Sequence, residues 1–150
     1  MGLKIGKLGK GSVVHESITY YTEKSLKRYW PGFEFARVGV SSTLGVQPDS
    51  LLLMPEGGRV PIQACHKNQP DYEAKRILDL HELALLDRAD PKSVEFVLVV
   101  AVNKQHKGAI ERAIKSQNKG KMPEKVALLD FDAVIAPEFD WDEVFNLMTG

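Results

Sequence analysis

The chain has 150 residues, of which 43% are hydrophobic and 27% charged, as is typical of one globular domain. Its formal net charge of zero argues against a strongly basic nucleic-acid-binding protein. A single cysteine, Cys65, excludes an internal disulfide and suits a reducing compartment, so we expect a cytoplasmic protein. The longest apolar run, Val94 to Val102, is too short for a membrane span, so we expect no membrane partner.

The first segment, residues 1–12, combines glycines with lysines and predicts a flexible basic lead-in, which leaves residues 13–150 as a single domain. Ser12 is a residue type that caps helix N-termini, so it predicts a helix from about Val13 to Tyr29. The Pro-Gly pair shortly after Tyr29 ends this helix, because both residues interrupt helical structure.

Three strands are predicted next. Apolar and polar residues alternate from Phe33 to Val40, which indicates a strand. A second strand is expected from Ser50 to Met54 and a third from Arg59 to Lys67. The pair Gly57-Gly58 between them predicts a tight turn, because glycine readily adopts positive φ. We therefore expect the second and third strands to form an antiparallel hairpin.

The second half alternates helices and strands. Residues Pro70 to Asp87 predict a helix with one apolar face, and Ser93 to Val102 a strand that is buried on both faces. A basic helix follows from Lys104 to Asn118, then a strand from Lys125 to Ile135 and a short helix from Trp141 to Met148. This order predicts an α/β fold in which a mixed sheet is flanked by helices.

Charge is distributed unevenly along the chain. Residues 104–121 contain six basic side chains and one acid, whereas residues 130–143 contain six acids and no base. In the basic helix an apolar stripe would face the sheet and the cations would face solvent, so a phosphate backbone is one candidate partner. The candidate nucleic-acid-binding residues are Lys104, Lys107, Arg112 and Lys115. The alternative is that the basic and acidic segments are two solvated faces that partly neutralise each other.

Two short stretches carry a resemblance to a known family. Pro48-Asp49 precedes the second predicted strand, and Gln63-Ala64-Cys65 lies on the third, after the Gly-Gly turn. With the order of elements, they resemble the PD-(D/E)XK nuclease superfamily over about residues 13–105. The core of that superfamily is a helix, a three-stranded meander, a helix and a strand. The resemblance therefore implies a restriction-endonuclease-like fold, here of the order α-β-β-β-α-β-α-β-α.

In that superfamily two carboxylates hold Mg²⁺, and a lysine two residues after the second carboxylate positions or activates the attacking water. Asp49 matches the first carboxylate, whereas Gln63 and Cys65 stand where the second carboxylate and the lysine are expected. Glutamine offers an uncharged oxygen, and a thiol suits magnesium poorly. Lys67 and Glu16 could complete the site. The resemblance thus implies a variant catalytic site of Asp49, Gln63, Lys67 and Glu16, with Asp49 and Gln63 as metal ligands and Mg²⁺ as the cofactor only if it is active.

A narrower resemblance, to replication-relaxation proteins of bacterial mobile elements, rests on His15 in the first helix and Tyr72 after the third strand. We expect a nucleic-acid-associated domain that binds DNA or a partner with weak or no cleavage. One alternative is an active magnesium-dependent DNA endonuclease with a variant site. Another is a protein-interaction module that docks a basic partner through residues 130–143. It also stays open that Asp49 only caps a turn, that Gln63 is a surface residue and that Cys65 is a small buried side chain.

Overall fold

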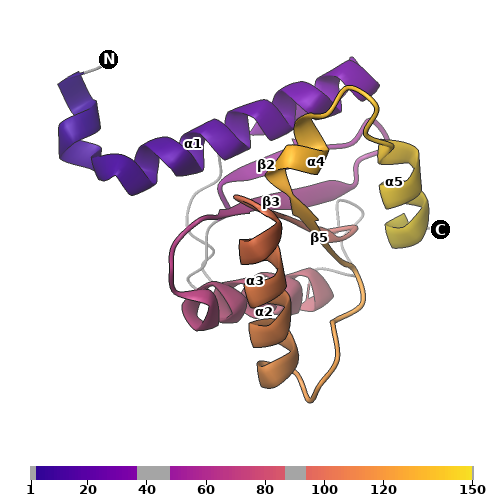
Figure 1. The fold of residues 1–150 in the computed structure, drawn as a ribbon. Helices are drawn as coiled ribbons and strands as arrows, with labels where there is room; N and C mark the ends of the chain where they lie inside the picture. The colour runs from indigo at the N-terminus through magenta and orange to yellow at the C-terminus, as the bar shows by residue number, and fades with distance from the viewer. Residues whose placement is uncertain (1–2, 37–47, 87–93, 150) are drawn as a thin grey trace.

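The computed structural model of the protein describes residues 3–36, 48–86 and 94–149, with side chains for residues 13–36, 48–82 and 94–149. It confirms the α/β class, because a five-stranded mixed sheet is flanked by helices (Figure 1). In chain order the elements are α1 (Leu3–Tyr29), β1 (Glu34–Ala36), β2 (Ser50–Leu53), β3 (Arg59–Cys65), α2 (Pro70–Leu86), β4 (Val97–Ala101), α3 (Lys104–Gln117), β5 (Val126–Asp130), α4 (Phe131–Ile135) and α5 (Trp141–Thr149).

The strands lie in the order β1-β2-β3-β4-β5, with β3 at the centre of the sheet. β1, β2 and β3 form an antiparallel meander, whereas β4 and β5 run parallel to β3. The predicted hairpin is confirmed: Ser50 lies opposite Ile62, and Gly57 has a φ of 102° in the connecting turn. The predicted third strand is too long at its end. Strand β3 ends at Cys65, so Lys67 lies beyond the strand.

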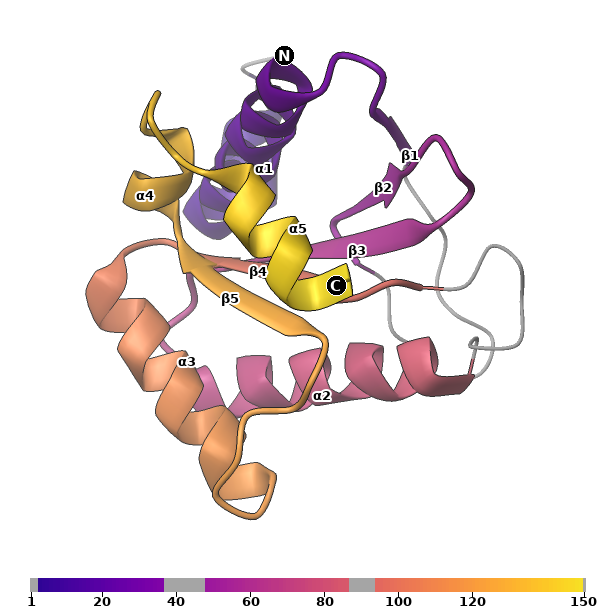
Figure 2. The same cartoon turned by 90° about the vertical axis from the view of Figure 1, so that its right-hand side faces the viewer.

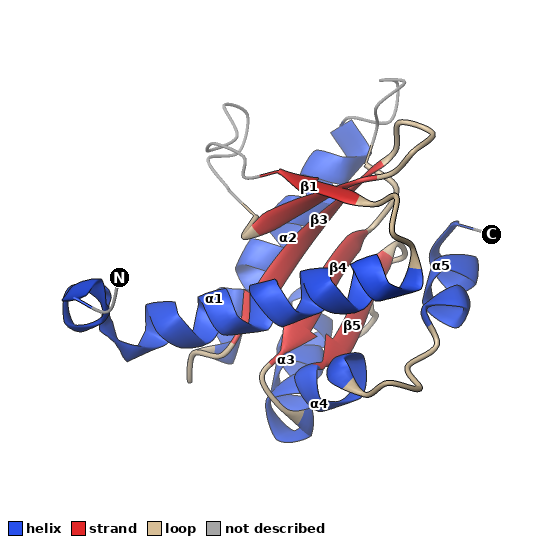
Figure 3. Cartoon of the chain, turned by 90° about the horizontal axis from the view of Figure 1, so that it is seen from above, coloured by secondary structure: helices blue, strands red, loops and turns tan. Residues whose placement is uncertain are grey.

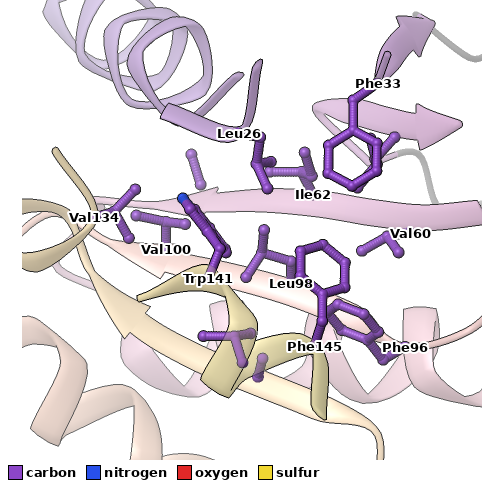
Figure 4. Close-up of a cluster of buried hydrophobic side chains, with 14 of the residues drawn as sticks. Leu26, Phe33, Val60, Ile62, Phe96, Leu98, Val100, Val134, Trp141 and Phe145 are labelled. Carbon is purple, nitrogen blue, oxygen red and sulfur yellow. The ribbon is translucent and has the colours of Figure 1, made fainter. Parts of the chain in front are cut away.

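One face of the sheet carries the larger hydrophobic core. Helix α1 and the C-terminal helices α4 and α5 cover this face, and α2 and α3 cover the other (Figure 2). Alternate residues of β3 and β4 point into this core, where they meet the aromatic side chains of Phe33, just before β1, and of Trp141 and Phe145 on α5 (Figure 4). The fully or nearly buried members from the central strands are Val60, Ile62, Ala64, Leu98 and Val100.

The opposite face of the sheet packs against α2 and α3. The strand residues that lie between those of the first core point to this face. Among them, Cys65, Val97 and Val99 contact apolar residues of the two helices. All five residues of β4 are buried, as predicted for a strand covered on both faces. The described residues include no helix long and apolar enough to cross a membrane.

A buried polar relay joins the two ends of the chain on the first face. The Ser25 hydroxyl of α1 donates a hydrogen bond to the carbonyl oxygen of Val134 at 2.8 Å. The Ser25 hydroxyl oxygen in turn accepts a hydrogen bond from Nε1 of Trp141 at 2.9 Å. Because a buried indole N–H requires a partner, Ser25 fixes α1 against both α4 and α5.

The start of α1 differs from the prediction. The helix begins at Leu3 and not at Val13, so Ser12 lies within it and residues 3–12 form its first turns rather than a lead-in before it. These turns extend beyond the edge of the sheet (Figures 1 and 3). Glycine weakens a helix without removing a backbone donor, unlike proline, so the glycines of this segment do not stop it.

The predicted strand from Lys125 to Ile135 is wrong in its second half. Strand β5 ends at Asp130, whose side-chain Oδ2 accepts a hydrogen bond from the backbone N–H of Ala133 at 3.1 Å. This carboxylate caps α4, which begins at once with Phe131. The cap adds a short helix to the predicted order. The other predicted strands are present but shorter, and residues 37–40, 87 and 93 of the predicted elements lie outside the described residues.

Two glycines give a test of this backbone. Gly57 has a φ of 102°, which L-residues rarely adopt, so we expect Gly57→Ala to lower the free energy of unfolding by about 1–2 kcal/mol. Gly108 lies inside α3, where an added Cβ would meet only the Arg112 side chain at 3.4 Å. Gly108→Ala should therefore raise the free energy of unfolding by about 0.5–1 kcal/mol. Urea denaturation of both variants measures the two effects, and equal shifts would contradict this assignment of the turn.

Candidate functional site

A cavity of about 210 Å³ lies at the C-terminal end of β3. Three elements contribute to its wall: α1, the end of β3 with the residues that follow it, and the first two turns of α2. The lining residues are His15, Gln63, Lys67, Tyr72, Glu73 and Arg76. The start of β2 lies beside the same strand end, because Asp49 N–H donates to the Ile62 carbonyl oxygen at 3.0 Å.

Asp49 directly precedes β2, one residue before the Ser50–Ile62 pair of the hairpin. Its Oδ2 accepts a hydrogen bond from the backbone N–H of Ala64 at 2.8 Å and lies 3.5 Å from Nε2 of His15. The same His15 nitrogen donates to the carbonyl oxygen of Ala64 at 2.5 Å. Asp49 and His15 thus satisfy both backbone groups of Ala64, which attaches α1 to the end of β3.

Gln63 is buried, with only 4% of its surface exposed, so it is not a surface polar residue. Its Nε2 donates a hydrogen bond to the Ala64 carbonyl oxygen at 3.2 Å. Its Oε1 is buried and has no hydrogen-bond partner in the part of the chain that the structure describes. Buried polar atoms are almost always paired in folded proteins, so an unpaired acceptor on the wall of a cavity indicates a place for a bound donor.

Cys65 and His66 follow Gln63 and differ in environment. Cys65 is 1% exposed, and burial, followed by the nearby Glu73 and Asp49, raises the pKa of its thiol well above the usual value. It stays protonated and is neither a nucleophile nor a soft metal ligand in this state. Burial lowers the pKa of His66 below 6.5, and the neighbouring His15, Lys67 and His106 lower it further.

Glu73 joins three elements at the cavity wall. Its Oε2 accepts hydrogen bonds from the backbone N–H groups of His66 and Lys67 at 3.0 and 3.1 Å. Its Oε1 accepts one from Nε2 of His106, at the start of α3, at 2.7 Å. The side chains of Glu73 and His106 are only 6% and 12% exposed. The carboxylate therefore fixes the chain after β3 and the first turn of α3 to the first turn of α2.

The outer part of the cavity wall carries cations and an aromatic ring. Lys67 is exposed, and its Nζ lies 5.9 Å from the centre of the Tyr72 ring. Arg76 lies one helical turn after Tyr72 on the same side of α2 and lines the same cavity. Tyr72 is 50% exposed, although it is large and partly apolar. This combination of guanidinium, ammonium and exposed ring suits an anionic, planar ligand.

The structure brings some of the predicted site residues together. Asp49 and Gln63 are neighbours, and Lys67 lines the cavity. Glu16 is exposed on α1, and its neighbour His15 is the residue that reaches the strand end. Among the described residues, no group of three or more His, Cys, Asp or Glu side chains is arranged to hold a metal ion. The catalytic and metal-binding roles of these residues stay predictions.

Sequence reasoning missed Glu73, Arg76 and His106. A signal was present for Glu73, because an acid in the first turn of a helix often binds backbone N–H groups near the helix start. Glu73 instead binds N–H groups of the preceding segment, and its pairing with His106 depends on how α2 packs against α3. No sequence spacing specifies that contact.

The basic helix α3 has the expected two faces. Ile110, Ala113 and Ile114 are buried against the sheet, which confirms the apolar stripe. The four candidate nucleic-acid-binding residues lie on the other side, where Lys104 and Arg112 are exposed and Lys107 and Lys115 half-buried. Lys115 pairs with Glu111 of the same helix at 3.1 Å. Because His106 contacts Glu73, the first turn of α3 lies next to the cavity.

Several acids of residues 130–143 have structural roles. Asp130 caps α4, and Oδ1 of Asp140 accepts a hydrogen bond from the N–H of Glu143 at 3.2 Å. The Tyr29 hydroxyl donates to Asp142, and this hydrogen bond, with burial and the charges of Asp142 and Asp140, raises the pKa of Tyr29 to about 12. These contacts give three of the six acids a partner within the chain.

Comparisons of the chain with known protein families, with curated proteins and with solved structures gave no match.

Substitution of Glu73 tests whether its carboxylate holds the site. Glu73→Ala removes the partner of two backbone N–H groups and of His106, so we expect a loss of about 3–5 kcal/mol in the free energy of unfolding. Lys75→Ala in the same helix is the control. It removes an exposed pair with Asp79 and should cost less than about 1 kcal/mol. Chemical denaturation of both variants measures the difference, and similar losses would contradict a central role for Glu73.

Proposed function

We propose that this chain is a nucleic-acid-binding domain with a nuclease-like fold and with weak or no cleavage activity. The observation that carries the proposal is the composition of the cavity at the end of β3. Two cations, Lys67 and Arg76, line it. Gln63, a neutral carboxamide, and Cys65, a buried thiol, stand at the positions that the resemblance gives to the second carboxylate and the lysine of a PD-(D/E)XK nuclease.

The topology supports the resemblance on which this proposal draws. The order of elements agrees with the superfamily core. Helix α1 is followed by the antiparallel meander β1-β2-β3, then by α2 on the other face and by β4 parallel to β3. Asp49 binds the backbone N–H of Ala64, the residue after Gln63, so both positions that the resemblance assigns to carboxylates lie at this strand end, which supports the proposal. His15 and Tyr72, which carry the narrower resemblance to replication-relaxation proteins of mobile elements, both line the cavity.

The donor set argues against efficient metal-dependent hydrolysis. Mg²⁺ favours anionic oxygens in octahedral geometry, and Gln63 supplies only a neutral one. One oxygen of Asp49 already accepts a hydrogen bond from Ala64. Cys65 is a protonated, buried thiol and cannot replace the motif lysine. Lys67 lies beyond the strand end, near the Tyr72 ring, and not on β3.

The distribution of cations argues for binding of phosphate. Lys67 and Arg76 at the cavity are joined to the first turn of α3 through the Glu73–His106 contact. Lys104 and Arg112 continue the exposed basic surface along α3. Phosphate contacts of this kind position a protein on nucleic acid without reading its sequence, so the expected binding is salt-dependent and largely non-specific.

A cleavage assay tests the catalytic part of the proposal. Purified protein is incubated with supercoiled plasmid in Mg²⁺ and in Mn²⁺, and nicked and linear products are quantified. We expect no products above those of the Asp49→Ala variant, because the second carboxylate is missing. Nicking by the wild-type protein that disappears in Asp49→Ala would establish an active endonuclease with a variant site instead.

A salt titration tests the binding part. We expect Lys104→Glu with Arg112→Glu to weaken binding of labelled DNA and to reduce the slope of log affinity against log salt by about 1–2, measured by fluorescence anisotropy. These two residues are chosen because Lys115 already pairs with Glu111. Thermal stability should change little, because both side chains are exposed.

The matched control for that titration is Lys24→Glu with Lys27→Glu on α1. It makes the same change in net charge on the opposite side of the sheet (Figure 2). We expect the control to retain the wild-type salt slope. Equal losses in the two double variants would indicate a general charge effect, and an absence of DNA binding at low salt would exclude the nucleic-acid function.

A further inference from the structure

We propose that the cavity at the end of β3 receives one unpaired nucleotide of a DNA strand, with its base against Tyr72 and Gln63 and its phosphate beside Lys67 and Arg76. This inference rests on the proposed nucleic-acid function and names the structure that is recognised. It assigns a ligand to the cavity independently of any cleavage.

The size of the cavity favours a small ligand. Pockets for drug-sized molecules are typically about 300–1,000 Å³, and this cavity of about 210 Å³ suits a single base with its sugar-phosphate only partly enclosed. A base inside a duplex cannot reach a buried side chain at the bottom of such a cavity. Only a base outside the stack, at a strand end or an unpaired position, can enter it.

The unpaired oxygen of Gln63 indicates a ligand with a hydrogen-bond donor. Three buried side-chain polar atoms have no partner among the described residues, and two of them, Oε1 of Gln63 and Nδ1 of His66, belong to this end of β3. His66 contacts the cavity wall through His15, with ring centres 4.7 Å apart. Base edges carry N–H donors in the plane of the ring, which is the geometry that a carboxamide oxygen accepts.

Tyr72 and the two cations provide the other contacts of a nucleotide. The Tyr72 ring is half-exposed on the first turn of α2, where a base can stack on it. Lys67 lies close to this ring, and Arg76 is on the same side of the helix. Glu73 is the acid in the lining, and both of its oxygens already accept hydrogen bonds from protein groups. Apart from Glu73 and His15, the side chains that line the cavity are cationic, aromatic or amide.

The test compares three labelled DNAs with the full chain by fluorescence anisotropy. The first is a short blunt duplex, the second is the same duplex with one unpaired nucleotide at an end, and the third has an abasic sugar-phosphate at that position. We expect the unpaired nucleotide to raise affinity by about tenfold over the blunt duplex, because stacking on an aromatic side chain contributes on this scale. The abasic DNA should lose most of that gain.

Two substitutions locate the effect in the cavity. Tyr72→Ala and Gln63→Met should each bring the affinity ratio between overhang and blunt DNA close to one. The double variant Lys104→Glu with Arg112→Glu should weaken binding of both DNAs and leave the ratio unchanged. Gln63→Met should leave the melting temperature close to that of the wild type. It removes the hydrogen bond to the Ala64 carbonyl oxygen, which still accepts from His15, together with a buried acceptor that has no partner among the described residues.

The outcomes separate this inference from the proposed function. If blunt and overhang DNA bind equally well and Tyr72→Ala changes neither, the inference is wrong while nucleic-acid binding stands. If the abasic overhang binds as well as the complete nucleotide, the cavity recognises phosphate alone and base recognition is wrong. If Gln63→Met lowers the melting temperature and keeps the affinity ratio, Gln63 is a structural residue. If neither DNA binds, both proposals are overturned.

Discussion

The buried carboxylate of Glu73 is the contact on which the site depends. It accepts hydrogen bonds from two consecutive backbone N–H groups after β3 and from His106 at the start of α3. A charged acceptor in such a place stabilises the loop only because every hydrogen bond is made. Without it, the two N–H groups after β3 and His106 would lose their acceptor, and the segment that carries Lys67 would lose these contacts to α2.

The position of the cavity follows from the central strand. β3 is antiparallel to β2 and parallel to β4, so its C-terminal end lies beside the start of β2 and the end of β4. Helix α1 reaches this point through His15, and α2 begins just after it. The same geometry could hold two carboxylates and a metal. Here residue 63 is an uncharged amide, so this strand end has one carboxylate fewer than the metal site that the resemblance implies, which agrees with the proposed anionic ligand.

Much of the fold could be predicted from local sequence. The alternation around the Gly57-Gly58 turn specified the hairpin, and the continuous apolar run specified β4. The start of α1 could not be predicted in the same way, because its glycines resemble a loop and no proline marks a boundary. The switch from β5 to α4 depends on one capping carboxylate, Asp130, within a sequence whose apolar residues fit either structure.

The site was predictable in part. Asp49, Gln63 and Lys67 could be found because motif spacing and strand register are local properties. The burial of Gln63 could not be predicted, because alternation shows on which face of a strand a side chain lies but not which element covers that face. The covering element is α2, and its position depends on packing between segments distant in sequence. Glu16 was chosen from its helix, whereas the rotation of α1 on the sheet selects its neighbour His15.

The relay through Ser25 has a consequence for the order in which the protein folds. Its two hydrogen bonds join residues that are 109 and 116 positions apart in the chain. A chain that has formed only α1 and the meander therefore still lacks the C-terminal segments that cover the rest of the inner face of α1. Contacts between such distant segments are slow to form because a long loop must close first. We therefore expect the part of α1 that α4 and α5 cover to become buried late in folding, after the rest of α1 has packed on β3.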